Sequence, residues 1–365
     1  MKTGTANLPL HYGSAPRWLF EKMTQLAREI SIILVTEYGS EEYLKRLSDP
    51  NWFQALGCVL GFDWHSSGLT TTTCGALKEG LRPVQKALGL FVAGGKGRAS
   101  RKTPEEITNS KIPSCQSLIY ASKLAAKVDN NALQDGFQLY HHSFFFTKAG
   151  QWAVVQQGMS LDPFGMNKGW ARRYHWLSDE VSDFVNEPHS AITSQVPSTQ
   201  SQTPIMNLVA SESKDNRQVT ARVSQVKPEA NIKTLKKLQQ ANLPQRHQVL
   251  LADINPDNLR KIFLTTYADQ PENFEKLLGM KGVGPKTIRA LSLIAELVYG
   301  TPASTRDPAR YSFAHGGKDG TPYPVDKKTY QQSIQFLNLA IKKAKIGHYE
   351  RLRALQRLHH YYVEI

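Results

Sequence analysis

Residues 277–291 read LLGMKGVGPKTIRAL, and in this stretch two glycines flank a valine immediately before a proline and a lysine. Glycine lets a backbone turn tightly and bring its amide N–H groups against a phosphate, where a Cβ would intrude. Proline suits the first position of a helix, and a helix N-terminus attracts anions. The stretch therefore predicts a phosphate-binding hairpin between two helices, with an ordinary glycine-bearing turn between packed helices as the alternative.

The apolar residues after this hairpin continue a helix and indicate the architecture of the C-terminal half. Ile288, Leu291 and Ile294 recur at helical spacing, and Gly300 is the expected C-cap. Nearly every segment from residue 231 onward has helical periodicity. We therefore predict a helical domain over residues 231–365.

The N-terminal half mixes helix and strand signals, and residues 139–146 and 151–159 are predicted to form a β-hairpin. Residues 1–190 are therefore assigned to an α+β domain. Residues 191–230 are polar and poor in aromatic side chains, which is typical of a linker or a loose loop. The predicted fold class is α+β, a mixed N-terminal domain followed by an all-helical one.

The charge of the chain points to a polyanionic partner. Its 365 residues include 45 Lys and Arg against 31 Asp and Glu, a formal net charge of +14. Such an excess is typical of proteins that bind nucleic acid, and no apolar run is long enough to cross a membrane. The three cysteines form no CxxC pair, which indicates a reducing compartment. We expect a cytoplasmic, nucleoid-associated protein that binds double- or single-stranded DNA.

A second basic segment reads GGKGRASRKTPEE at residues 94–106 and leads into a predicted helix that begins at Thr103 and Pro104. A basic glycine loop before a helix suits phosphate, while the lack of a GxxxxGK[ST] pattern gives no indication of ATP binding. The residues predicted to contact DNA are, in the hairpin, Gly282, Val283, Gly284, Lys286 and Thr287, and elsewhere Lys96, Arg98, Arg101, Lys102 and Lys318.

The hairpin resembles the helix-hairpin-helix motif, and YPVDKKTY at residues 323–330 extends the likeness to the DNA glycosylases of that superfamily. The resemblance implies a Schiff-base nucleophile at Lys286, an essential carboxylate at Asp326 and no cofactor. A helix N-terminus disfavours a cationic lysine, and a facing carboxylate stabilises positive charge on the sugar. The interval between Lys286 and Asp326 is longer than usual in that superfamily. The alternatives are a phosphate contact for Lys286 and a helix N-cap for Asp326.

Two other functions stay open. In a metal-dependent nuclease, Asp63, His65, His141 and His175 would bind a divalent cation, because carboxylate and imidazole are suitable ligands. These histidines would otherwise form hydrogen bonds inside a polar sheet or contact phosphate. In the other hypothesis, the protein is a DNA-binding adaptor that catalyses no reaction.

Several stretches resemble one family along nearly the whole chain. They are TGTANLPLHYGSAPRWLF (3–20), FQALGCVLGFDWHSSG (53–68), GGKG (94–97) and FAHGGKDG (313–320). They are similar to the uncharacterised bacterial and archaeal proteins of domain-of-unknown-function family 763. That resemblance implies no established activity. The charge and the hairpin predict a DNA-binding protein, and the likeness to the helix-hairpin-helix superfamily implies a DNA-repair protein that acts on damaged or structured DNA, as a glycosylase or abasic-site lyase in the preferred interpretation.

Overall fold

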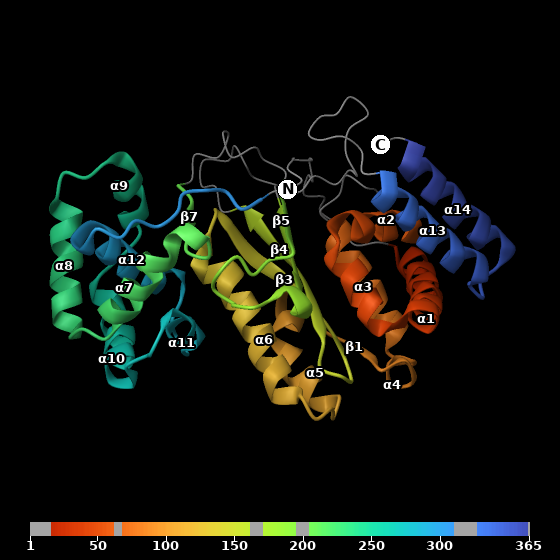
Figure 1. Cartoon of the computed structure of the whole chain (residues 1–365), viewed down its shortest axis with the longest axis horizontal. Helices are drawn as coiled ribbons and strands as arrows, with labels where there is room; N and C mark the ends of the chain where they lie inside the picture. The colour runs from red at the N-terminus through yellow and green to blue at the C-terminus, as the bar shows by residue number, and fades with distance from the viewer. Residues whose placement is uncertain (1–15, 62–67, 161–170, 195–203, 310–326, 364–365) are drawn as a thin grey trace.

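The computed structural model of the chain describes residues 16–61, 68–160, 171–194, 204–309 and 327–363. Figure 1 shows three groups of elements in a row. A sheet with two helices stands in the middle, helices α7 to α12 lie at one end, and α1 to α3 lie with α13 and α14 at the other. None of the described helices is both long and apolar enough to cross a membrane.

The central sheet has five strands in the order β1-β3-β4-β5-β6, and every neighbouring pair is antiparallel. The predicted β-hairpin is confirmed, since β3 and β4 pair with Phe144 opposite Val154. The α+β fold class is likewise confirmed. The strands are β1 (Leu90–Lys96), β3 (Phe137–Thr147), β4 (Trp152–Ser160), β5 (Ala171–Leu177) and β6 (Ala191–Ser194).

Side chains alternate between the two faces of this sheet and so contribute to two cores. Phe144 and Val154 belong to one core and Phe145 and Val155 to the other. The first face packs against α5 (Thr103–Asn109) and α6 (Cys115–Lys127), and the second packs against N-terminal helices. These helices are α1 (Arg17–Ser48), α2 (Pro50–Leu60), α3 (Gly68–Leu81) and the short α4 (Gln85–Leu88).

The first core continues from the sheet into a helical lobe. Ile232 and Leu235, three positions apart on one helix, are both buried in it. The lobe consists of α7 (Lys214–Ser224), α8 (Pro228–Gln240), α9 (Gln245–Leu251), α10 (Arg260–Asp269), α11 (Phe274–Gly279) and α12 (Pro285–Tyr299). Shorter turns are η1 (Gly97–Lys102), η2 (Val128–Ala132), η3 (Ser178–Glu180), η5 (Ser211–Ser213) and η6 (Asp257–Leu259).

The prediction of a loose linker over residues 191–230 is wrong for its described parts, 191–194 and 204–230. The first part is edge strand β6, and β7 (Met206–Asn207) pairs with β2 (Leu133–Gln134). Several polar side chains of α7 are buried: Asn216 Oδ1 accepts hydrogen bonds from the hydroxyls of Ser292 and Thr220. Polarity here reflects a hydrogen-bonded helix interface, which composition does not distinguish from a linker.

The structure also divides the predicted helical domain of residues 231–365. Helices α13 (Lys327–Lys343) and α14 (His348–Val363) lie beside α1 and α2, away from α7 to α12 (Figure 1). Leu337, Ile341 and Leu358 are buried in the core formed by the N-terminal helices. Helical periodicity identifies an apolar face but not the partner that covers it. The packing of α13 and α14 on the N-terminal helices was therefore not predicted.

Candidate functional site

The hairpin has the predicted backbone form. Helix α11 ends at Gly279, α12 begins at Pro285, and Gly282 between them has φ +87°. Lys281 and Gly282 are exposed to solvent. Gly300 ends α12 in the left-handed conformation with φ +72°, as a C-cap glycine should.

The carbonyl groups of the hairpin face inward, onto helix α6 and turn η2. Lys127 Nζ donates to Met280 O at 2.5 Å and to Val283 O at 3.1 Å. Asn131 Nδ2 also donates to Val283 O, and Gln134 Nε2 donates to Pro285 O. Burial lowers the pKa of the Lys127 amine. These bonds fix the hairpin onto the body that carries the sheet.

Two of the predicted hairpin contacts have buried side chains. Val283 is part of the first core and Thr287 is also buried. Their side chains therefore stabilise the turn. Lys286 is half exposed, and its Nζ lies 3.1 Å from Asp253 Oδ2 and donates to Asp253 O. The other proposed catalytic residue, Asp326, and the predicted DNA contact Lys318 lie outside the described residues.

The second predicted phosphate segment is the turn η1 after strand β1. The side chains of Lys96, Arg98, Arg101 and Lys102 are all exposed. Helix α5 begins at Thr103, as predicted, and no side chain caps it; the Thr103 hydroxyl donates to Ser100 O at 2.7 Å. We name residues 96–102 the basic loop.

The base of the basic loop is held by a buried contact that requires glycine. Gly94 has φ +92°, and a Cβ on it would clash with the backbone oxygen of His142. Its N–H donates to Glu106 Oε2, and Lys78 Nζ donates both to Gly94 O and to Glu106. The basic loop is thus fixed against strand β3.

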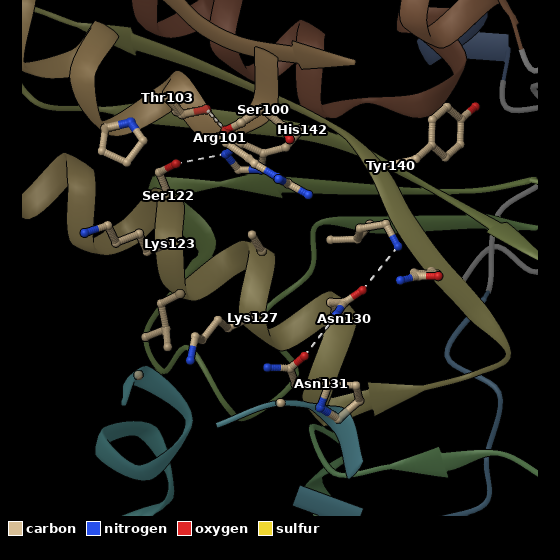
Figure 2. A pocket seen from close by; sticks show the side chains of 18 of the residues that line it. Ser100, Arg101, Thr103, Ser122, Lys123, Lys127, Asn130, Asn131, Tyr140 and His142 are labelled. Atoms are coloured by element: carbon tan, nitrogen blue, oxygen red, sulfur yellow. Dashed lines mark hydrogen bonds between the residues drawn. The ribbon is translucent and has the colours of Figure 1, made fainter. Parts of the chain in front are cut away.

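One cavity of about 740 Å³ is lined by both predicted phosphate segments. Ser100 and Arg101 of the basic loop and Val283 and Gly284 of the hairpin contribute to its wall. Figure 2 shows this cavity, with helix α6 and strand β3 completing its lining. The polar side chains that α6, η2 and β3 contribute to the lining include Ser122, Lys123, Lys127, Asn130, Asn131, Tyr140 and His142. No local motif signals this cavity, because its walls come from distant segments.

A chain of hydrogen bonds leads from this cavity into the sheet. Ser122 Oγ lies 2.8 Å from His142 Nε2, as Figure 2 shows, and His142 Nδ1 lies 2.8 Å from Gln156 Oε1. Gln156 Nε2 donates to Asp129 Oδ2 at 2.6 Å. The same carboxylate accepts from Trp176 Nε1 at 3.0 Å, and His189 Nε2 lies 2.5 Å from its other oxygen. We name the residues Ser122, His142, Gln156 and Asp129 the relay.

The relay fixes the tautomer of its histidine. The amide nitrogen of Gln156 donates to Asp129, so the amide oxygen of Gln156 faces His142 and accepts from it. The proton of the imidazole is then on Nδ1, and Nε2 presents a lone pair to the Ser122 hydroxyl. Burial lowers the pKa of His142, so the ring is neutral at neutral pH. The relay residues are scattered in the sequence, and no motif signalled them.

The predicted metal ligands are not brought together within the described part of the chain. Asp63 and His65 lie outside it, between α2 and α3. His141 and His175 are on β3 and β5, with β4 between them. His175 Nδ1 donates to Leu47 O, and His141 Nε2 lies 3.0 Å from Ser143 Oγ. Among the described residues, no three His, Cys, Asp or Glu side chains are grouped to hold a metal.

Fold and site define an α+β protein in which a glycine hairpin and a basic loop border one cavity. A family model described as "Protein of unknown function (DUF763)" matches residues 4–325. The chain belongs to that family, as the resemblance of its sequence implied. No curated protein and no solved structure matches the chain significantly.

Proposed function

We propose that this protein binds DNA through the sugar–phosphate backbone, with the hairpin and the basic loop as its two contacts. The observation that carries the proposal is their convergence. Each segment has the chemistry of a phosphate site, and residues of both line one cavity although they lie far apart in the chain. A single strand or duplex that crosses this cavity would contact both at once.

The orientation of the hairpin supports phosphate binding. The side chains of Lys127, Asn131 and Gln134 donate hydrogen bonds to carbonyl groups on its inner side. The N-terminus of the 15-residue helix α12 follows directly, and it contributes partial positive charge. Lys281 is exposed beside it and Lys286 is half exposed. For Lys286 we favour a phosphate contact at the exposed surface over a nucleophile, because its amine is paired with Asp253 and the described lining of the cavity does not include it.

The contacts proposed here carry no sequence information. They come from backbone amides and from Lys and Arg side chains, which bind phosphate regardless of the base. The cavity has the size of a small-molecule site, large enough for a nucleotide turned out of a stack. Contacts without base specificity and a cavity of this size support action on damaged or structured DNA. A protein that binds DNA in this way would be associated with the nucleoid.

Three readings of this DNA-binding function differ in chemistry. The lyase reading requires Lys286 to leave Asp253 and to meet Asp326. The nuclease reading depends on a cation held with Asp63 and His65. The adaptor reading requires no reaction. Both phosphate segments line the cavity, so the geometry of the described residues supports DNA binding there. It does not single out the lyase or the nuclease reaction.

We expect the triple substitution Arg98→Gln, Arg101→Gln and Lys102→Gln to weaken DNA binding in a salt-dependent way. Removing one phosphate contact should lower the slope of log K against log salt by about 0.9, so the triple variant should lose about 2 to 3 units. Fluorescence anisotropy with a 20-nucleotide single strand and the matching duplex, titrated at several salt concentrations, measures this slope.

The matched control is the triple substitution of Lys233, Lys236 and Lys237 by Gln. These lysines are exposed on α8, at the far end of the molecule from the sheet (Figure 1). The control removes the same charge and should leave the slope within about half a unit of the wild type. Equal slopes for the two triple variants would refute the assignment of the basic loop.

A further inference from the structure

We propose that the cavity is a catalytic site in which Ser122 is the nucleophile and His142 the general base of a phosphodiester hydrolysis. The identity of the substrate, a DNA phosphodiester, rests on the proposed function, whereas the nucleophile and base rest on the relay alone. This assignment differs from the Lys286 and the metal readings, since it uses neither.

The geometry is that of an activated serine. The Ser122 hydroxyl lies 2.8 Å from His142 Nε2, within the range needed for proton transfer. Both side chains line the cavity, although Ser122 is 2% and His142 5% exposed. The base is itself oriented by a third group, the amide of Gln156, as an activated nucleophile requires.

The charge of the relay favours proton transfer from the serine. His142 begins neutral, so it has a lone pair for the proton. Once the ring is protonated, the Nδ1–H bond to Gln156 Oε1 becomes charge-assisted, and the Asp129 carboxylate stabilises the positive ring from beyond Gln156. Trp176 and His189 hold that carboxylate in place. Gln156 and Asp129 are therefore positioning residues.

The surroundings of Ser122 favour a phosphoryl over an acyl substrate. Ser122 is an interior residue of α6, so its own backbone N–H belongs to the helical ladder and is not offered to an oxyanion. The cavity instead presents the cationic side chains of Arg101 and Lys123. Cations are the usual stabilisers of the charge that develops on a transferring phosphoryl group.

The reaction balances in two steps. In the first, Ser122 Oγ bonds to phosphorus, its proton moves to His142 Nε2, and the P–O bond to the leaving hydroxyl breaks as that oxygen takes the proton. In the second, water attacks the phosphoserine, His142 accepts the proton of the water, and the Oγ–P bond breaks as Ser122 regains a proton. The products are a strand end with a hydroxyl and one with a phosphate.

A fluorophosphonate tests the nucleophile without DNA, because an activated serine displaces its fluoride and retains the phosphonyl group. In the full-length protein, intact mass should rise by one phosphonyl group, and peptide mapping should place it on Ser122. Ser122→Ala should abolish labelling. Ser117→Ala is the matched control, since Ser117 is exposed on the same helix and its hydroxyl donates to Ser114 O; it should label like the wild type.

Two further variants separate chemistry from structure. His142→Gln should slow labelling at least about 100-fold, the usual contribution of a general base. Gln156→Met removes the acceptor that stabilises the protonated ring, so it should lower the pKa of His142. The rate rises with pH as His142 deprotonates, and its midpoint should therefore move to lower pH in this variant. A merely structural role for Gln156 would reduce the rate without moving the midpoint.

The outcomes distinguish this proposal from DNA binding. In Ser122→Ala, cleavage of the same 20-nucleotide duplex should disappear together with the labelling, whereas Ser117→Ala should retain both. Labelling that persists in Ser122→Ala, or its absence from the folded wild type, overturns the catalytic pair even where DNA binds. Labelling on Ser122 without DNA binding supports the nucleophile and refutes the proposed function.

Discussion

Acidification from pH 7 to pH 5 is expected to destabilise this protein steeply. His141, His142 and His175 are buried in the sheet, and burial lowers the pKa of each, to about 3 for His141. Their unfolded value is about 6.5. The unfolded chain therefore binds protons that the folded protein excludes. The stabilisation is fully present above pH 6.5 and is lost as the pH falls from there toward the folded pKa values.

The free energy of unfolding is expected to change steeply with pH in this range. Each excluded proton contributes up to about 1.4 kcal/mol per pH unit, so His141 and His175 together contribute up to about 3 kcal/mol per pH unit, and His142 acts in the same direction. Urea unfolding at intervals between pH 7.5 and pH 5 measures this slope. His141→Gln should reduce it by about a third, whereas His348→Gln, a substitution of an exposed histidine, should leave it unchanged. A flat free energy of unfolding over this range would contradict the burial of neutral histidines.

The substitution Gly282→Asp is expected to lower DNA affinity by about 100-fold or more. The aspartate would place a carboxylate where the phosphate is proposed to lie, and repulsion between like charges in a binding interface costs several kcal/mol. Gly282 is exposed, with Ile262 Cδ1 the neighbour that a Cβ would meet. The aspartate also strains the backbone at φ +87°, so the loss of affinity beyond that of a control with the same strain should lie in binding. Anisotropy at low salt, with a thermal melt of each variant, measures both.

Gly300→Asp is the matched control for this substitution. Gly300 lies at the opposite end of the same helix and has a similar positive φ, and a Cβ added there would meet no atom within 4 Å. Both variants carry the same added charge and the same cost of a left-handed aspartate. Gly300→Asp should bind DNA nearly as the wild type does. If the two variants lose affinity equally, the hairpin does not touch DNA.

Local features of this fold were predictable from the sequence. Gly282, Pro285 and Gly300 correctly indicated the turn, the start and the end of α12. These residues act through backbone conformation, which depends on few neighbours. The pairing of β3 with β4 was predictable for the same reason, because a short turn joins the two strands.

Long-range features were not predictable in this way. The apolar face of α13 was visible in Leu337 and Ile341, but its packing on the N-terminal helices was not. The cavity and the relay depend on β3 pairing with β4 and on α6 covering them, which brings Ser122, His142 and Gln156 together. A serine within a helix and a glutamine within a strand have no local signature. Their role is visible only in the tertiary structure.

Hydrogen exchange of the full-length protein, with and without a DNA duplex, tests the central claim most directly. The claim is that one DNA molecule contacts the hairpin and the basic loop together. DNA should slow exchange in peptides that cover residues 97–104 and 280–288, with little change in α8 or α14. Protection of only one of these two segments, or protection confined to α8 or α14, would contradict the account.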